Sequence, residues 1–248
     1  MPLSVAIITR NAASQLGGCL ASVAFADEVV VVDSGSTDGT IELARRHGAR
    51  VIAKEWLGFG PQKQFAVDSA SHDWVLCLDA DEKLSEDLRD SIIAELKAPR
   101  GFVYAMPRCN RFLGHLLRHG EGYPDWSVRL FHRQHARWGN ETVHEKVVTT
   151  LPVIRLRGDL LHDSAETLEK YLDKQNRYTS LQAESLRAAG RHANLLQLVF
   201  SPSLRFVKFY LFRLGFLDGV AGLVHIAIGC TNTFNKYAKL KALERASK

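Results

Sequence analysis

The stretch WVLCLDADE at residues 74–82 decides the fold class, because an apolar run ends there in a cluster of acids. A short apolar run without polar alternation is typical of a strand buried on both faces. The same pattern occurs upstream in Leu3–Thr9 and in EVVVVD at 28–33, and residues 13–23 between them have helical spacing. Buried strands that alternate with helices predict an α/β protein with a parallel sheet. Ligands of such sheets bind at the carboxyl ends of the strands.

The pattern changes after Pro99 and again near Ser164. Further strands are expected at 50–53, 101–107, 126–131 and 153–156, and further helices at 62–70, 166–189, 195–200 and 204–216. We therefore predict one domain over residues 1–163, with halves at 1–100 and 101–163, followed by a helical region at 164–248.

Composition narrows the class of protein. Of the 248 residues, 46% are hydrophobic and 24% are charged, which excludes a disordered chain, a collagen and a coiled coil. The net charge of +5 fits an anionic partner, which can be a phosphorylated ligand, an acidic membrane surface or a nucleic acid. Four cysteines without a CxxC pair, and an apolar start of only six residues, indicate a cytosolic protein with reduced thiols.

Asp33 ends the second strand and is followed by glycines at 35 and 39. A carboxylate at this edge can accept hydrogen bonds from a nucleobase or a ribose, and the glycines allow a tight turn. Alternatively, Asp33 and Asp38 only cap the next helix, for which Ser36 or Thr37 are further candidate caps. The local pattern leaves both roles open.

Asp79 and Asp81 are two residues apart, so on an extended segment they face the same way. Two carboxylates this close repel each other unless a cation lies between them, and oxygen ligands suit Mg²⁺ or Mn²⁺. The alternative is a solvated acidic turn before a helix capped by Ser85. The acid at the earlier strand end favours the metal site. Because no GxxxxGK[ST] or GxGxxG motif is present, a metal would carry much of a diphosphate's charge.

The chain resembles a known enzyme family in SVAIITRN at 4–11, VVVVDSGSTDGT at 29–40 and WVLCLDADE. These motifs together resemble the family 2 glycosyltransferases. Within that family, YPDWSVRLF at 123–131, VHEKV at 143–147 and LLHDS at 160–164 resemble the bacterial lipopolysaccharide-core glucosyltransferases. The resemblance covers nearly the whole chain. It implies the GT-A fold, a Rossmann-like and mostly parallel central sheet flanked by helices, with a nucleotide-sugar half and an acceptor half.

The resemblance implies donor-binding roles at the strand ends. Thr9, Asn11 and Asp33 would hold the uridine of a nucleotide-sugar, although Ala12 stands where many members of the family have glutamate. Further residues expected at the donor are Ser36, Asp38, Asp79 and Ala80.

The metal would be bound directly by Asp81, while Asp79 would reach the ribose or the metal. His162 is a candidate ligand of the metal or the diphosphate, as in some GT-A enzymes. The implied cofactor is Mg²⁺ or Mn²⁺, and the implied donor is UDP-glucose.

The catalytic base of the family is an acid in a later motif, which here corresponds to His144-Glu145. Glu145 is therefore the expected base and Asp125 the second candidate. Arg129, in the alternating strand WSVRLF, is expected to add a fixed cation near the leaving diphosphate, or else to lie on a solvated strand face. A base opposite the leaving group predicts a single displacement with inversion.

The C-terminal third carries two apolar helical stretches. Residues 204–216 are apolar almost all round, so this helix is expected to be buried or to meet lipid. Residues 219–235 contain no Asp, Glu, Lys or Arg, although they include His225. The second stretch is too short to span a bilayer, so we expect an interfacial membrane anchor there. Basic residues near it favour anionic lipid, namely Lys236, Lys239, Lys241 and Arg245. The alternative is that these helices pack on the enzyme or on another subunit.

The sequence therefore predicts an inverting, metal-dependent glycosyltransferase. It would move a hexose from a UDP-sugar to a lipid-anchored saccharide such as the lipopolysaccharide inner core, as a cytoplasmic protein peripheral to the inner face of the plasma membrane. No nucleic-acid partner is expected, and the oligomeric state stays open. The alternatives are a nucleotidyltransferase on a related sheet, and a non-enzymatic module that binds membrane or nucleic acid.

Overall fold

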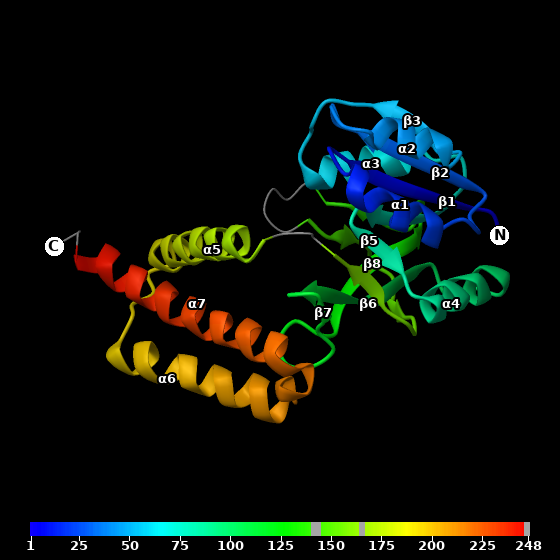
Figure 1. The fold of residues 1–248 in the computed structure, drawn as a ribbon. Coiled ribbons are helices and arrows are strands. Elements are labelled where there is room, and N and C mark those ends of the chain that lie inside the picture. Colours follow the sequence, from blue (N-terminus) through cyan, green and yellow to red (C-terminus); the bar gives the residue numbers. More distant parts are fainter. Residues whose placement is uncertain (140–144, 164–166, 246–248) are drawn as a thin grey trace. The chain divides into compact units, whose positions relative to one another are not determined.

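The computed structural model describes residues 1–139, 145–163 and 167–245, and it divides into two compact units (Figure 1). The sheet unit comprises residues 1–109 and 124–163, and the helical unit comprises residues 110–123 and 164–248, as far as each is described. The segment 110–123 thus groups with the C-terminal helices, which the sequence pattern had not indicated.

The first half of the sheet is parallel, as predicted. Its strands are β1 (Leu3–Thr9), β2 (Glu28–Asp33), β3 (Arg50–Ala53) and β4 (Trp74–Asp79), in the order β3-β2-β1-β4. The register places Thr9 beside Asp33 and Ile8 beside Asp79. The polar ends of β1, β2 and β4 therefore meet at one edge of the sheet.

The second half of the sheet is antiparallel. β4 pairs with β8 (Asp125–His132) and β8 with β6 (Val103–Phe112), and β12 (Leu160–His162) and β5 (Glu82–Leu84) complete the order. β11 (Ile154–Arg155) lies parallel to β6, and β9 (Arg137–Trp138) pairs with β10 (Val147–Val148) apart from the main sheet. The sheet is therefore mixed. β5 and β12, which were not predicted, have three residues each, too few to show a periodicity.

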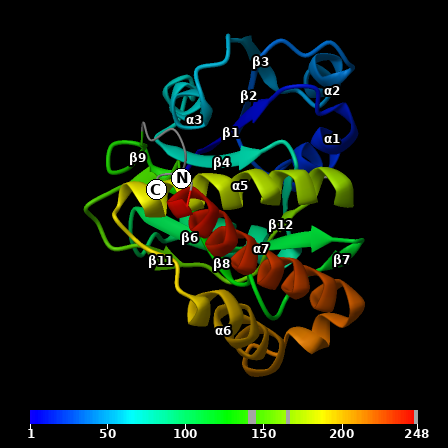
Figure 2. The same ribbon diagram turned by 90° about the vertical axis from the view of Figure 1, so that its left-hand side faces the viewer.

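Helices cover both faces of this sheet (Figure 2). α1 (Ala13–Ser22), α2 (Thr40–Arg46) and α4 (Glu86–Lys97) contribute to one buried core cluster, and α3 (Phe59–Asp68) contributes to a second. All seven residues of β1 are buried between the two clusters. This burial explains the unbroken apolar run in its sequence.

The helix starts agree only in part with the predicted caps. α2 begins at Thr40 after Gly39, and neither Ser36 nor Thr37 caps it. The helix starts later because the side chain of Asp38 accepts a hydrogen bond from the Thr40 backbone at 3.0 Å. α4 is capped as predicted, since the Ser85 hydroxyl accepts from the Leu88 backbone at 3.3 Å.

The helical unit contains α5 (Leu168–Ala188), α6 (Leu195–Phe206) and α7 (Gly219–Arg245). A π-helical turn (Val207–Phe212) continues α6, and a 3-10 turn (Gly215–Asp218) leads into α7, which packs against both α5 and α6. The helices predicted separately at 195–200 and 204–216 are thus joined through Pro202, which lies inside α6.

The segment 110–123 is tied to these helices by a buried carboxylate. Asp218 accepts hydrogen bonds from the backbone of Arg118 at 3.2 Å and of His119 at 2.8 Å. The imidazole of His119 lies 2.8 Å from the same carboxylate. The segment is therefore part of the folded helical unit.

Candidate active site

A cavity of about 530 Å³ opens at the carboxyl ends of β1 and β4, within the sheet unit. Its volume is in the range of small-molecule sites, and its position is where open α/β sheets bind their ligands. Trp56 and Phe59 form part of the wall, and their rings meet edge to face at 4.8 Å. Several predicted site residues line the cavity, namely Thr9, Asn11, Asp79, Ala80, Asp81 and His162.

Side chains tie the turn after β2 to the end of β1. Asn11 has φ 50°, a left-handed conformation that asparagine tolerates, and its side-chain oxygen accepts from the Thr37 backbone at 2.8 Å. The Asn11 backbone donates to the Ser36 hydroxyl at 2.8 Å, and the Ala13 backbone donates to Asp38 at 3.2 Å. Asn11, Ser36 and Asp38 thus shape the cavity wall through the turn.

The Asp33 carboxylate accepts hydrogen bonds within the turn that follows β2. Asp33 is 1% exposed, and its carboxylate accepts from the backbone of Gly35 at 3.0 Å and of Ser36 at 2.9 Å, as well as from the Ser36 hydroxyl. Asp33 thus stabilises the turn after β2 and does not cap α2, which begins at Thr40. Thr9, its neighbour in the register, differs, because its buried hydroxyl has no hydrogen-bond partner among the described residues. An unpaired buried hydroxyl at a cavity wall is available to a ligand.

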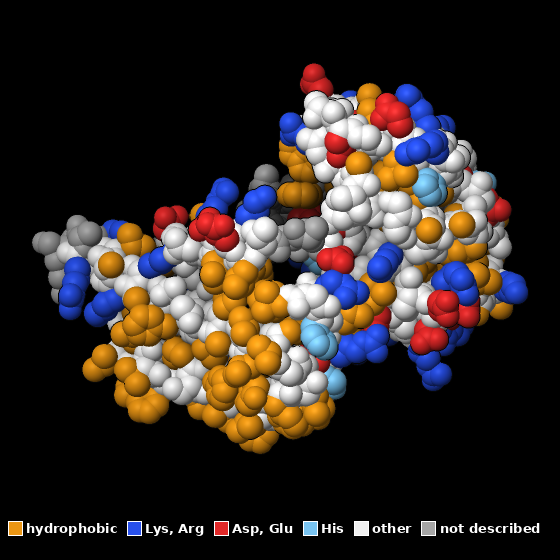
Figure 3. Space-filling model, viewed as in Figure 1, with side chains coloured by type: hydrophobic (Ala, Val, Ile, Leu, Met, Phe, Trp, Pro, Cys, Tyr) orange, Lys and Arg blue, Asp and Glu red, His pale blue; other side chains and the backbone are white. Residues whose placement is uncertain are grey.

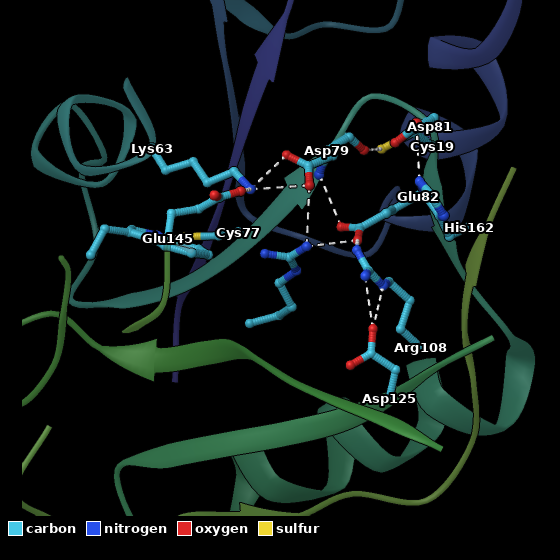
Figure 4. Close-up of polar contacts among 12 residues, drawn as sticks. Cys19, Lys63, Cys77, Asp79, Asp81, Glu82, Arg108, Asp125, Glu145 and His162 are labelled. Carbon is cyan, nitrogen blue, oxygen red and sulfur yellow. Dashed lines mark hydrogen bonds and ion pairs between the residues drawn. The ribbon is translucent and has the colours of Figure 1, made fainter. Parts of the chain in front are cut away.

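Asp79 lies between two cations at the end of β4 (Figure 4). The Lys63 ammonium is 3.0 Å from one of its oxygens, and the Arg129 guanidinium is 3.1 Å from the other. Both basic side chains are buried, at 5% and 6% exposure. Burial alone would raise the pKa of Asp79, but the two cations outweigh it and hold that pKa well below its usual range. Asp79 is therefore an ionised carboxylate that is already paired.

Arg129 does not lie on a solvated strand face, which was one of its two predicted settings. Its guanidinium donates to the fully buried Glu82 at 2.7 Å, while Glu82 also accepts from the Asp79 backbone at 3.0 Å. Burial would lower the pKa of Arg129, but Glu82 and Asp79 together raise it. The ring of Trp138 lies 4.8 Å from the Lys63 nitrogen and 5.5 Å from the Arg129 guanidinium carbon, which adds cation–π attraction. Arg129 is thus a fixed cation.

Asp81, in the turn between β4 and β5, lies close to His162 at the end of β12. The register of β12 with β5 places His162 beside Glu82, and its Nε2 lies 3.2 Å from an oxygen of Asp81. Among the described residues, no three His, Cys, Asp or Glu side chains form a metal cluster. Two protein ligands leave the other coordination positions to water and substrate phosphate, which is how Mg²⁺ and Mn²⁺ commonly bind. The pair therefore fits a divalent cation that binds together with a diphosphate.

The two candidate bases lie in different surroundings. Glu145, 26% exposed, has its carboxylate 3.6 Å from the Lys63 ammonium, so Lys63 joins it to Asp79. Asp125, 39% exposed, is held by Arg108 through contacts of 2.7 and 3.0 Å. The structure thus brings Glu145 beside the paired aspartate. His144 of the same predicted motif lies outside the described residues.

Three charged residues of the ion-pair network around Asp79, Arg129 and Asp125 were not predicted from the sequence. Lys63, Glu82 and Arg108 connect the predicted residues to one another. Glu82 closes the motif WVLCLDADE, so its position beside the paired acids was an available signal. Lys63 and Arg108 gave no such signal, because a single basic residue in a helix or a strand usually lies in solvent.

Known proteins share this sequence pattern. Residues 4–155 match the model of glycosyl transferase family 2, and the chain belongs to this family. It is 32% identical to the lipopolysaccharide core biosynthesis glycosyltransferase LpsC of Rhizobium meliloti (strain 1021), with 97% of this chain and 92% of that protein covered. It is also 32% identical to an uncharacterized glycosyltransferase of Rickettsia prowazekii (strain Madrid E), with coverage of 99% and 88%. The predicted resemblance and enzyme class are confirmed.

Solved structures give more distant likenesses. TarS of S. aureus in complex with UDP-GlcNAc is 14% identical, with a TM-score of 0.49 and coverage of 100% of this chain and 93% of that chain. Glucosyl-3-phosphoglycerate synthase of Mycobacterium tuberculosis with Mn²⁺ and UDP-glucose is 22% identical, with a TM-score of 0.37 and coverage of 44% of each chain. With the family match, the mixed sheet between two helix layers is the predicted GT-A fold with a C-terminal helical extension.

Proposed function

We propose that this protein is an inverting, metal-dependent hexosyltransferase. It would move glucose from UDP-glucose to a lipid-anchored saccharide such as the lipopolysaccharide inner core. The observation that carries the proposal is the Asp81–His162 pair at 3.2 Å on the wall of the strand-end cavity. The Thr9 hydroxyl lines the same cavity and has no hydrogen-bond partner among the described residues, so it could contact a nucleoside.

The donor would bind along the carboxyl ends of β1 and β4. In this proposal Thr9 and the wall shaped by Asn11 contact the uridine, and Asp81 with His162 holds the divalent cation at the diphosphate. Bound there, the cation would stabilise the negative charge of the leaving UDP. Lys63 and Arg129 keep Asp79 ionised and fixed at the edge of the same cavity.

Glu145 is the proposed base. An acceptor hydroxyl oxygen forms the bond to the anomeric carbon of the sugar while the bond from that carbon to the diphosphate breaks. The proton of the hydroxyl passes to the Glu145 carboxylate, and UDP leaves. General-base assistance of this kind contributes about 10²–10⁴-fold in rate. Since one group attacks as the other leaves, the configuration at the anomeric carbon inverts.

The acceptor and the location are part of the same proposal. The name of the LpsC relative supports a saccharide of the lipopolysaccharide core as acceptor. Such an acceptor is anchored in a bilayer, so we place the enzyme at the cytoplasmic face of the plasma membrane. The exposed apolar side chains of the helical unit support this location.

The test is UDP release from a panel of UDP-sugars, with Mn²⁺ or with EDTA. We expect slow hydrolysis of one donor by the wild type, which is lost with EDTA and in Asp81→Ala. Asp90→Ala is the matched control, because Asp90 is an exposed acid on α4 and should leave the rate unchanged. If the folded protein fails to bind UDP in the presence of Mn²⁺, the proposal of a uridine donor is wrong.

A further inference from the structure

The helix formed by α6 and its π-helical continuation turns its apolar side outward. Exposed positions recur along residues 195–212 as adjacent pairs every four residues, and only Ser203 and Lys208 among them are polar. The apolar members are Leu195, Leu196, Val199, Phe200, Leu204, Val207, Leu211 and Phe212. A helix on the surface of a soluble domain has the opposite arrangement, with its apolar stripe toward the core.

Of the basic residues on this helix and at its end, Arg205 and Arg213 make contacts within the helical unit, while Lys208 is exposed. Arg205 donates to Glu121 at 3.1 Å and to the Thr233 hydroxyl of α7 at 3.3 Å. Gly229 of α7 leaves room for the pair, since a Cβ there would collide with the Glu121 carboxylate. Arg213 donates to the backbone oxygen of Tyr123 at 2.6 Å. Charged groups inside and apolar groups outside are what a lipid environment selects.

The same surface continues past the π-helical turn. Exposed apolar side chains follow on the 3-10 turn and the start of α7, namely Leu214, Phe216, Leu217 and Val220. Together with the eight side chains above they form what we call the apolar face, and Figure 3 shows hydrophobic side chains gathered over α6. An apolar surface as extended as this one marks a contact with a partner or a membrane.

The charge pattern points to lipid headgroups. From Ser185 to Leu217 the sequence contains no Asp or Glu. Arg205 is paired with Glu121, and the other basic residues of this stretch are exposed, namely Arg187, Arg191, Lys208 and Arg213. Basic side chains beside an apolar surface are attracted to anionic lipid. Two copies of this chain that met through the apolar face would bring like charges together, which opposes pairing.

The two C-terminal apolar stretches differ in how much of each is buried in the helical unit. The sequence favoured residues 219–235, but α7 buries Ala221, Gly222, Ile226, Gly229 and Thr233 in the helical unit. Among the described residues, the only stretch long and apolar enough to cross a membrane is Leu195–Phe212, and none of it is buried. Its inner side packs on α7 and carries a paired charge, which favours a helix that lies in the plane of the interface.

We propose that the apolar face is a membrane-docking surface that embeds in the headgroup–acyl boundary of a bilayer with anionic lipids. Lys208, the one basic side chain in the exposed stripe, would extend its ammonium to the headgroups. Membrane docking would bring the active site to a lipid-anchored acceptor, and only this consequence rests on the proposed function.

The test is co-sedimentation of the full chain with vesicles, without donor or acceptor. The vesicles contain phosphatidylethanolamine with phosphatidylglycerol, or phosphatidylcholine alone. We expect the double variant Leu196→Ser/Phe200→Ser to lower the partition coefficient at least about tenfold, because two large apolar side chains leave the bilayer. The matched control is Leu172→Ser/Leu181→Ser on α5, where the side chains are similarly apolar and exposed but lie outside the apolar face. Its partition should equal that of the wild type.

A second variant tests the charge. Lys208→Gln should lower binding about fivefold on vesicles with phosphatidylglycerol and leave binding to phosphatidylcholine unchanged. Folded wild type that binds neither kind of vesicle would overturn the proposal. A dimer would also overturn the proposal if light scattering detects it in the wild type and not in Leu196→Ser/Phe200→Ser. A second copy of the chain would then cover the apolar face. UDP binding without vesicles is measured separately, so failure of the donor chemistry leaves the vesicle result intact.

Discussion

The ammonium of Lys63 lies 3.6 Å from the carboxylate of Glu145. The two residues come from α3 and from the segment just before β10, which are far apart in the sequence. The same ammonium is 3.0 Å from Asp79. One buried cation therefore contacts both the proposed base and Asp79, the acid at the end of β4. A change at Lys63 is expected to affect both.

Replacing Lys63 should destabilise the sheet unit. In Lys63→Met, Asp79 and Glu145 lose a buried partner, and breaking a buried ion pair costs about 3–5 kcal/mol. Urea unfolding would measure this loss. Lys97→Met, at the exposed last turn of α4, is the matched control and should cost little. Equal losses in the two variants would show that the Lys63 contacts contribute nothing specific.

The two candidate bases should differ in their kinetic effect. Glu145→Gln should lower the transfer rate by about 10²-fold or more while UDP affinity stays unchanged, because only proton removal is lost. Asp125→Asn should retain most activity, since Asp125 is held by Arg108 rather than by the Lys63 centre. Steady-state rates with acceptor, together with UDP titrations, separate the two. The reverse order of effects would make Asp125 the base.

His162 should control metal affinity. In His162→Ala, the Mn²⁺ concentration needed for half-maximal UDP binding should rise at least about tenfold, since even residues that only orient a metal ligand contribute 10–100-fold. Calorimetric titration of UDP at several Mn²⁺ concentrations would show it. His192→Ala changes an exposed histidine of the helical unit and should leave the curve in place. An unchanged curve in His162→Ala would remove this residue from the metal site.

Gly60 should not tolerate a methyl group. An added Cβ would collide with the backbone oxygen of Gly139 and lie 3.7 Å from Cβ of Glu145. Gly60→Ala should therefore displace Gly139, whose backbone donates to the Lys146 oxygen at 2.9 Å, and through Lys146 disturb the adjacent Glu145. We expect a lower melting temperature and a lower transfer rate. Gly17→Ala is the matched control inside α1, where the new Cβ meets Leu43 at an ordinary 3.8 Å. That variant should be as stable as the wild type or more so.

Glu28 should contribute to acid stability. Burial raises the pKa of this carboxyl, but hydrogen bonds from Ser4, Ser71 and Arg50 outweigh it and lower the pKa from 4.5 to about 2. The unfolded chain thus takes up the proton first as the pH falls. The stabilisation, about 3 kcal/mol by linkage, is complete above pH 4.5 and is lost as the pH falls through the folded pKa of about 2. Glu28→Gln should lower the free energy of unfolding at neutral pH and flatten its slope over this window. Glu42→Gln, at an exposed position of α2, should leave that slope as it is.

The parallel half of the sheet could be predicted because its strands are apolar runs that end in Asp33 and Asp79. Residues buried on both faces leave an unbroken pattern that no surface residue interrupts. β5 and β12 could not be predicted, because a strand of three residues depends on its partner rather than on its own periodicity. The sheet is mixed because β8 and β6, which were predicted as strands, pair antiparallel with β4 and with each other.

The site was predictable where a motif places acids at a strand end, as it does for Asp81. Lys63 could not be predicted as a site residue, because its burial depends on Asp79 and Glu145, which only the folded chain brings together. The two C-terminal helical stretches are similarly apolar in sequence. Gly222 and Gly229 decide that α7 is the inner one, since they allow the close approach of other backbone and side-chain atoms.

The tie between His119 and Asp218 imposes an order on biosynthesis. The two residues are 99 positions apart, so at about 5–20 residues per second the ribosome makes the second some 5–20 s after the first. During that interval the strands on either side of residues 110–123 can pair, and β7 (His115–Leu116) can pair with the end of β6. The contacts of Arg118 and His119 with Asp218 must wait for the C-terminal part of the chain. A chain cut after residue 163 would keep this segment in its unfinished state permanently. We therefore expect that removing the C-terminal helices would expose residues 110–123, because their contacts with Asp218 would be lost.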